Sequence, residues 1–167
     1  WTAQWITTTG ANDRHPIFYH TLPDGADKKV TKARLYICGL GLYEAYLDGV
    51  KIGADWLTPG FNAYHLWVQT QTYDVTEMMQ SRPKELSILA GDGWYKSRIP
   101  FEGSSVGFYG NDYRVLAELH IEYADGSKEV LSTDESWQVR RSNITFSGIY
   151  DGEWQDETLP QGEVEAG

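Results

Sequence analysis

The sequence predicts an all-β fold: a jelly-roll-like antiparallel β-sandwich with long loops at one end and little helix. Short apolar runs recur along the chain between turn signals rich in Gly, Asp and Asn, which is typical of β-sandwiches. The aromatic content is high, with 7 Trp and 11 Tyr among 167 residues. Only residues 77–80 show a helical pattern, and the Pro at position 83 limits its length.

The first half of the chain contains strands joined by tight turns. Residues 33–38 alternate between two faces, so we expect a strand there with one face in the core. Asp48-Gly49 lies between strand candidates at residues 43–47 and 50–52. This pair favours a type I′ hairpin turn, because both of its positions need a positive φ. Further strands are expected at residues 1–6, 17–21 and 68–73.

A strand that ends at an aromatic rim lies at the centre of the chain. The apolar run at residues 86–90 predicts a buried strand, and Gly91-Asp92-Gly93 predicts a turn. Trp94 and Tyr95 follow at once, so one carboxylate and two aromatic side chains meet at the same edge. Aromatic faces beside polar groups suit sugar rings, whereas packing in the core is the commoner use of aromatic residues. Both interpretations stay open.

The second half repeats the β pattern. Residues 114–123 alternate most clearly, with one face predicted in the core and the other, which carries Glu118 and His120, in solvent. Asp125-Gly126 predicts the next turn, and residues 150–154 are interpreted as the exit from the sandwich. Further strands are expected at residues 128–132, 136–140 and 144–149.

Length and composition limit the domain organisation and the partners. The 167 residues are expected to form one domain over residues 1–159, followed by a disordered tail at residues 160–167. The formal net charge of -10 argues against a nucleic acid or an anionic membrane as partner, and it permits a cation such as calcium. No apolar run approaches the ~20 residues of a membrane span. The single Cys38 excludes a disulfide within the chain and is expected to be a buried thiol.

Signals for targeting and for catalysis are missing from the residues themselves. The first ten residues contain no basic and apolar segments of a signal peptide, which leaves the compartment open. There is no G-x-S-x-G motif, and the four histidines lack metal-type spacing. Many carboxylates are present, but nothing in the sequence selects the pair that an independent glycosidase would need.

The remaining chemical signal is a rim of aromatic and oxygen-bearing side chains in separate loops. The loop at residues 55–67 carries Asn62, Tyr64 and Trp67, and the turn at residues 92–95 carries Asp92 beside its two aromatic residues. Such groups can stack on a sugar and accept hydrogen bonds from its hydroxyls. They could also hold a calcium ion that binds two hydroxyls. Alternatively, surface aromatic residues can mark the contact with a neighbouring domain.

Five sequence motifs, in order, resemble those of one known family. They are GLGLYEAYLDGVKIG, LTPGFNAY, QTQTYDVT, LAGDGWY and YDGEWQDE, within a match from about Trp5 to Thr158. The chain thereby resembles the N-terminal β-sandwich domain of bacterial α-L-rhamnosidases of glycoside hydrolase family 78. The resemblance implies hydrolysis of terminal α-L-rhamnose by carboxylates on a separate (α/α)6 barrel. That barrel and its motif are not in this sequence, so this chain is expected to be no enzyme on its own and to contain no catalytic residue.

The resemblance implies two functions. The first is a non-catalytic module that recognises rhamnose-containing carbohydrate. Its predicted calcium ligands are Asp92 and Glu44, although Glu44 could equally be a buried structural carboxylate. The second is a structural domain that braces the barrel and the other domains of the parent enzyme and has no ligand of its own. The predicted carbohydrate contacts of the first function are Trp67, Trp94, Tyr95, Tyr64 and Asn62.

Overall fold

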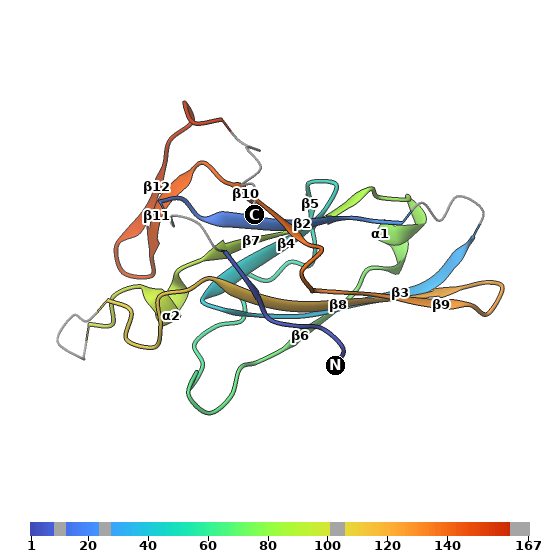
Figure 1. Cartoon of the computed structure of the whole chain (residues 1–167), viewed down its shortest axis with the longest axis horizontal. Coiled ribbons are helices and arrows are strands. Elements are labelled where there is room, and N and C mark those ends of the chain that lie inside the picture. Colours follow the sequence, from blue (N-terminus) through green and yellow to red (C-terminus); the bar gives the residue numbers. More distant parts are fainter. Residues whose placement is uncertain (9–12, 24–27, 101–105, 161–167) are drawn as a thin grey trace.

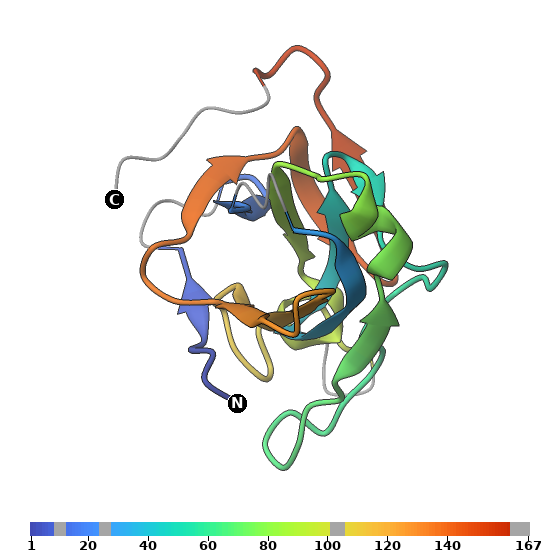
Figure 2. The same ribbon diagram turned by 90° about the vertical axis from the view of Figure 1, so that its right-hand side faces the viewer.

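The computed structural model describes residues 1–8, 13–23, 28–100 and 106–160. Two five-stranded antiparallel sheets face each other, and a two-stranded sheet lies beside one end of them (Figure 1). Viewed along the strands, the two large sheets curve around a common interior (Figure 2). The predicted all-β sandwich with little helix is therefore confirmed.

The first large sheet is built on the pairing of β3 (Val30–Leu40) with β8 (Arg114–Tyr123). Their register places Leu35 opposite Leu119, and both side chains are buried. The bounds of β8 are those expected from its alternation. The other strands of this sheet are β1 (Ile6–Thr7), β6 (Gln71–Asp74) and β9 (Lys128–Ser132).

The second large sheet has β7 (Glu85–Gly91) at its centre, between β2 (Pro16–Thr21) and β4 (Leu42–Leu47). The turn after β4 has φ values of 45° at Asp48 and 77° at Gly49, which confirms the predicted two-residue hairpin turn. The strands at the two edges of this sheet are β10 (Gln138–Arg141) and β5 (Val50–Lys51).

The core lies between these sheets and is made by the inward-facing residue of each alternating pair. Phe18 and Ile88 of the second sheet pack in one cluster with Leu35 and Ile121 of the first. Each is at most 1% exposed, and burial of such a side chain contributes roughly 1.5–3 kcal/mol to the free energy of unfolding. Cys38 is also buried, and burial raises the pKa of its thiol to about 11.

The two short helices show how far the structure agrees with the sequence prediction. Helix α1 (Thr76–Gln80) lies where a helix was expected. Its N-cap position is Val75, and the Asp74 carboxylate accepts the Thr76 N–H at 3.0 Å. Helix α2 (Gly93–Lys96) was not predicted. Its first residue has φ 53°, and a Cβ there would lie 2.8 Å from Leu42 Cγ, so glycine is needed at this turn.

The exit segment forms a second unpredicted element. Residues 150–154 were expected to leave the sandwich, but β12 (Gly152–Gln155) pairs with β11 (Ile144–Gly148) in an antiparallel hairpin. The predicted tail begins at position 160, and residues 161–167 lie outside the described part of the chain. In that described part, no helix is long and apolar enough to cross a membrane.

The N-terminal segment corrects two expectations. The strand expected at residues 1–6 is reduced to β1, and the residues before it are held by Glu118. That side chain was expected in solvent but is 6% exposed, because its carboxylate accepts the Ala3 N–H at 3.0 Å and pairs with His120 at 2.8 Å. Burial alone would raise the pKa of Glu118. Hydrogen bonds from His120, Ala3 and Thr2 outweigh burial and lower the pKa to about 2.

Candidate functional site

Long loops from three parts of the chain meet at the end of the sandwich that carries α2 (Figure 1). None of these segments lies in the two large sheets, so their positions depend on side-chain contacts and on a few backbone hydrogen bonds, such as that from the Tyr43 N–H to the Thr58 carbonyl at 2.9 Å. These segments are residues 52–70 between β5 and β6, the described residues of 97–113 after α2, and the β11–β12 hairpin.

An aromatic cluster fills the space between the first two segments and α2. Its rings are mostly inclined to one another rather than stacked, and the Phe108 and Tyr109 centroids lie 4.8 Å apart. Edge-to-face packing of this kind stabilises aromatic pairs beyond the area that they bury. We call this group the aromatic cluster; its members are Phe61, Tyr64, His65, Trp94, Tyr95, Phe108 and Tyr109.

Tyr64 lies at the centre of the aromatic cluster. Its ring centroid is 5.1 Å from that of Tyr95 and 5.1 Å from that of Tyr109. Its hydroxyl is buried without a hydrogen-bond partner among the described residues, and burial raises its pKa to about 12. A Cβ on Gly110 would lie 2.1 Å from Tyr95 Oη, so only glycine lets the backbone approach there. The cluster is therefore held together by ring–ring contacts, while its outer members stay open to solvent, with Phe61 50% and Phe108 49% exposed.

The predicted carbohydrate contacts fall into two groups. Tyr64, Trp94 and Tyr95 come together in the aromatic cluster. Trp67 lies in the same loop as Tyr64 and keeps an exposed side chain, at 53%. Asn62 is fully buried instead, because its Oδ1 accepts the Gln69 N–H at 3.0 Å and its Nδ2 donates to a backbone carbonyl two residues earlier. Asn62 therefore closes the loop and has no surface to offer a ligand.

A groove of about 600 Å³ lies next to the aromatic cluster. Its floor is the outer face of β4 and β7, and the β11–β12 hairpin forms its opposite wall. Trp56 stands at its border with 78% of its surface exposed. We call it the hairpin groove; the polar and aromatic residues that line it include His15, Glu44, Tyr46, Trp56, Asn143, Glu153 and Gln155.

Glu44 has two side-chain partners in the hairpin groove. Its carboxylate pairs with Lys51 Nζ at 2.6 Å and also accepts a hydrogen bond from the Tyr46 hydroxyl. Lys51 Nζ lies 3.7 Å from the centre of the Trp56 ring, so the same ammonium covers one face of that indole. Burial, followed by the contact with Glu44, raises the pKa of Tyr46, which therefore stays a hydrogen-bond donor.

Asp92 lies in a different environment. Its carboxylate accepts a hydrogen bond from Tyr113 Oη at 2.7 Å and is 3.6 Å from Lys96 Nζ. That ammonium also lies 3.3 Å from the centre of the Tyr113 ring. Burial lowers the pKa of Lys96, and it raises the pKa of Tyr113, to which Asp92 also contributes. The group joins both ends of α2 to Tyr113, the residue before β8.

The two predicted calcium ligands have no partner in common. Glu44 and Asp92 each face a different lysine ammonium, which occupies the position where a cation would be attracted. Across the described residues, no group of three or more His, Cys, Asp or Glu side chains is arranged to hold a metal ion. These two side chains do not fit one calcium site, and calcium binding stays a prediction.

The hairpin groove contains two carboxylates, yet neither has the surroundings of a catalytic acid. A glycosidase needs a carboxyl group whose pKa is raised by an apolar environment. Glu44 instead pairs with an ammonium group, and Glu153 is exposed to solvent, where Gln155 Nε2 donates to it at 2.5 Å. The groove can hold a polar ligand, but its carboxylates are arranged to accept hydrogen bonds.

The sequence did not predict the wall of the hairpin groove that the β11–β12 hairpin forms. Asn143 and Glu153 reach it because β11 and β12 pair and lie across the groove from β4, although these segments are far apart in the chain. The tip of the hairpin is held by Arg98, whose guanidinium pairs with Asp151 at 2.7 Å, and by Trp94, which donates to Tyr150 Oη at 3.3 Å. The Asp151-Gly152 pair was the available signal, since it is a hairpin turn sequence.

The family described as "Alpha-L-rhamnosidase N-terminal domain" matches residues 28–165 of this chain. An α-L-rhamnosidase of Streptomyces avermitilis is 39% identical over 129 residues, which are 77% of this chain and 12% of that protein. The chain thus spans less than a fifth of the length of the curated relatives that it matches.

Solved structures give the same relationship. The crystal structure of an α-L-rhamnosidase from Aspergillus terreus matches with a TM-score of 0.80 and 33% identity, over 91% of this chain and 18% of that one. The structure of the Streptomyces avermitilis α-L-rhamnosidase complexed with L-rhamnose matches with a TM-score of 0.76 and 37% identity, over 86% of this chain and 14% of that one.

Proposed function

This chain belongs to the family of α-L-rhamnosidase N-terminal domains, and from that premise we propose that it is a carbohydrate-recognising accessory module whose sugar site is the hairpin groove. The observation that carries the proposal is the lining of that groove. One exposed indole, two carboxylates and two side-chain amides converge on a space of about 600 Å³. Pockets for small ligands have this size and this mixture of apolar walls and a few placed polar groups.

The proposed ligand is a terminal L-rhamnose unit. A deoxyhexose has an apolar face with a methyl group and a second region rich in hydroxyls. Trp56, which keeps one face free of Lys51, suits the apolar part, and Glu44 and Asn143 suit the hydroxyls. A relative has been crystallised with L-rhamnose, and this supports the choice of sugar.

Trp67 and Trp94 are proposed as outer contacts for the rest of a glycan. Trp67 is exposed, and Trp94 is half-buried where the aromatic cluster meets the hairpin through Tyr150. Tyr64 and Tyr95 are then not direct contacts of the sugar. Their rings pack on each other and support the loop that carries Trp67. In this arrangement the aromatic cluster sets the shape of the site and the groove holds the sugar.

Isothermal titration of L-rhamnose into the 167-residue chain tests the proposal. Glu44→Gln should weaken binding about tenfold, because it removes a charge-assisted hydrogen bond, whereas Glu122→Gln on the outer face of β8 should leave it unchanged. Titration with calcium and then with EDTA decides whether the predicted ion takes part. No heat at millimolar sugar, with the chain shown to be folded, would overturn the sugar-binding proposal.

A second function is favoured by a separate observation on the loop at residues 52–70. Its large apolar side chains stand out in solvent, with Leu66 75%, Trp67 53% and Leu57 55% exposed. Grouped apolar exposure marks interaction surfaces. We therefore propose, as the alternative, that this loop packs on the remaining domains of a larger α-L-rhamnosidase and that the chain braces them.

Hydrogen exchange distinguishes the two functions. Under the bracing function, amides of residues 61–69 should exchange more slowly in the longer enzyme than in the 167-residue chain. The amides of β9, which belongs to the other end of the sandwich, serve as the internal reference. Equal exchange rates in both forms would remove the bracing function and leave the sugar-binding proposal untouched.

A further inference from the structure

A second hollow lies at the opposite end of the sandwich from the aromatic cluster, beside α1. Its volume is about 330 Å³. Its floor is apolar and buried, with Val30, Met79, Ile121 and Tyr123 each at most 8% exposed. Its rim is exposed and basic. We call it the cationic cleft; the basic side chains that line it are Lys28, Lys29, Arg82 and Lys84.

The charge of this cleft contrasts with that of the whole chain. The formal net charge is -10, yet the described lining contains four basic residues and neither Asp nor Glu. The nearby carboxylates of Asp125 and Glu129 belong to the β8–β9 hairpin, where hydroxyl groups of Ser127 and Tyr123 donate to them. The cleft is therefore a local basic site on an acidic protein.

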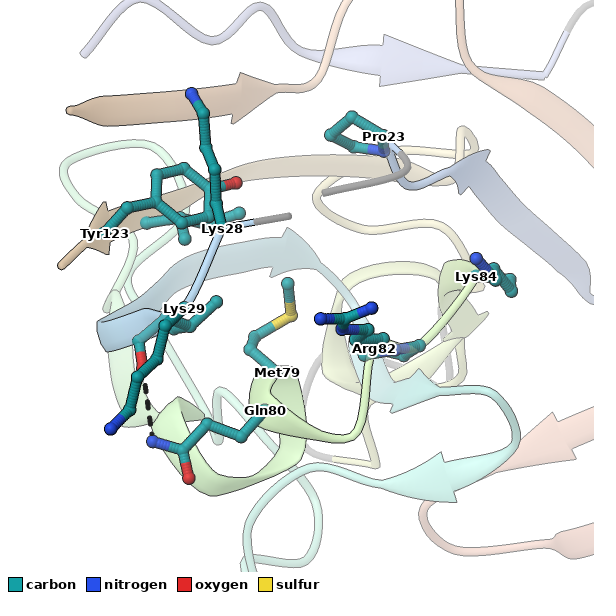
Figure 3. Close-up of a pocket in the computed structure, with 11 residues that line it drawn as sticks. Pro23, Lys28, Lys29, Met79, Gln80, Arg82, Lys84 and Tyr123 are labelled. Carbon is teal, nitrogen blue, oxygen red and sulfur yellow. Dashed lines mark hydrogen bonds between the residues drawn. The ribbon is translucent and has the colours of Figure 1, made fainter. Parts of the chain in front are cut away.

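The basic rim residues come from two connecting segments, one just before β3 and one between α1 and β7. Figure 3 shows Lys28 beside Tyr123 on one side and Arg82 with Lys84 on the other, with Met79 between them. The guanidinium of Arg82 points toward Met79 across the middle of the cleft. Helix α1 is fixed against β3, because Gln80 Nε2 donates to the Val30 carbonyl at 3.2 Å. This contact joins the two segments that carry the basic residues.

Arg82 adopts a conformation that an arginine rarely takes. Its φ is 59°, in the left-handed region that favours glycine, directly after α1 and before Pro83. This backbone turns the side chain over the cleft. Among the described residues, neither Arg82 nor Lys29 pairs with a carboxylate. Lys28 donates to Ser127 Oγ at 3.2 Å, lies over the Tyr123 ring and interacts electrostatically with the Asp125 carboxylate. Within the described part of the chain, Arg82 and Lys29 are therefore the charges that a ligand can reach.

We propose that the cationic cleft is a second binding site that takes the carboxylate of an acidic sugar residue. The guanidinium of Arg82 suits a carboxylate because it donates in a planar fork, and Lys28 and Lys29 add charge at the rim. The buried floor suits the C–H face of a pyranose. The anionic preference comes from the cleft alone, while the choice of a saccharide rests on the proposed function of the chain.

A pair of matched sugars tests the inference in the 167-residue chain. Methyl β-D-glucuronoside and methyl β-D-glucoside differ in the carboxylate. Titration of each, followed by amide chemical shifts, should show shifts at Val30, Gln80 and Arg82 with the glucuronoside only. The affinity should fall as salt is added, because exposed charges are screened. Equal effects of both sugars, shifts confined to other residues, or no shifts would overturn the inference.

Two variants locate the charge. Arg82→Asn keeps a residue that tolerates a positive φ and should weaken glucuronoside binding about tenfold, as expected for the loss of one charge-assisted hydrogen bond. Lys128→Gln removes an exposed charge on β9, outside the cleft lining, and should leave the affinity for the glucuronoside unchanged. Equal losses in both variants would overturn the assignment to the cleft.

Two further ligands identify the source of the anion. If inorganic sulfate reproduces the glucuronoside shifts at the same concentration, the cleft is a general anion site and the proposal of an acidic sugar is wrong. If a tetraglutamate peptide binds more tightly than the glucuronoside, the ligand of the cleft is an acidic protein segment and the proposal of an acidic sugar is wrong. L-rhamnose binding at the hairpin groove is measured independently with Glu44→Gln, so failure of either site is distinguishable from failure of the other.

Discussion

The aromatic cluster and the hairpin groove lie side by side at one end of the sandwich, but they use aromatic residues in opposite ways. In the cluster the rings contact one another, and Tyr64 even buries its hydroxyl without a partner among the described residues. In the groove Trp56 stands in solvent with polar side chains around it. Aromatic content alone therefore does not identify a sugar site, because what matters is whether the faces of the rings remain open.

The difference between the two regions assigns stability to the cluster and recognition to the groove. Truncation of a ring in the interior of the cluster, such as Tyr95, should lower the free energy of unfolding and leave the binding of L-rhamnose itself intact at temperatures where the chain is folded. Truncation in the groove should do the reverse. Each variant is therefore measured twice, once by urea unfolding and once by sugar titration.

Tyr95→Ala should have the largest effect on stability. It removes the ring that packs on Tyr64 and leaves a cavity beside Gly110, at a cost of about 3 kcal/mol in the free energy of unfolding. Trp67→Ala, which truncates an exposed ring of the neighbouring loop, should cost less than about 0.5 kcal/mol. Similar costs for the two variants would mean that Tyr95 is not packed in the interior of the cluster.

Asn62→Ala should come next. The variant leaves the Gln69 N–H and the Gly60 carbonyl without their buried partner, which should cost about 2 kcal/mol in the free energy of unfolding. L-rhamnose affinity should stay the same, because Asn62 is fully buried. A variant of unchanged stability that has lost sugar binding would show instead that this amide contacts the ligand.

His15 should make the stability depend on pH. It lines the hairpin groove, is buried, and has its Nδ1 3.1 Å from the Ala90 carbonyl oxygen. Burial lowers its pKa from 6.5, against the opposing effect of Asp92, and Lys96 lowers it further. The unfolded state then binds the proton more readily. The free energy of unfolding should therefore fall as pH drops below 6.5, by up to about 1.4 kcal/mol per pH unit.

The variant His15→Gln isolates this contribution, because it removes the titrating group from the groove. The slope of stability against pH just below 6.5 should flatten in this variant. His65→Gln, at an exposed position, serves as the matched control and should keep the slope of the parent chain. Parallel curves for all three proteins would show that His15 does not carry the pH dependence.

Asp151→Asn should have only a small effect on stability. It breaks the ion pair with Arg98 that holds the hairpin tip, and ion pairs at the surface contribute little to the free energy of unfolding because solvent screens them. Sugar affinity should still fall a few-fold, because the wall of the groove becomes looser. The Asp112→Asn variant, which breaks an exposed pair with Arg114 away from the groove, should leave the affinity alone.

The parts of the fold that follow from short-range patterns could be predicted. The alternation in β8 and the Asp48-Gly49 turn are properties of neighbouring residues, and both are confirmed. Glu118 was misplaced because its burial depends on Thr2 and Ala3, more than a hundred residues away in the chain.

The site was harder to predict for the same reason. The sequence indicated the aromatic residues and the loops that carry them, but it could not say which rings would face one another. The hairpin groove arises only when β11 and β12 pair and lie across from β4, and the role of Asn62 arises from two backbone contacts inside its loop. Helix α2 was missed because a single turn begins at Gly93, where the sequence shows only a turn signal.

A residue-resolved map of L-rhamnose binding would decide whether the hairpin groove is the sugar site. Amide chemical shifts of the 167-residue chain are followed during titration with the sugar. We expect the largest shifts at Glu44 and Tyr46 of β4 and at residues 148–152 of the hairpin, with little change at Val30 and Gln80 of the cationic cleft. Largest shifts outside the hairpin groove, or none at saturating sugar, would contradict the assignment of recognition to the groove.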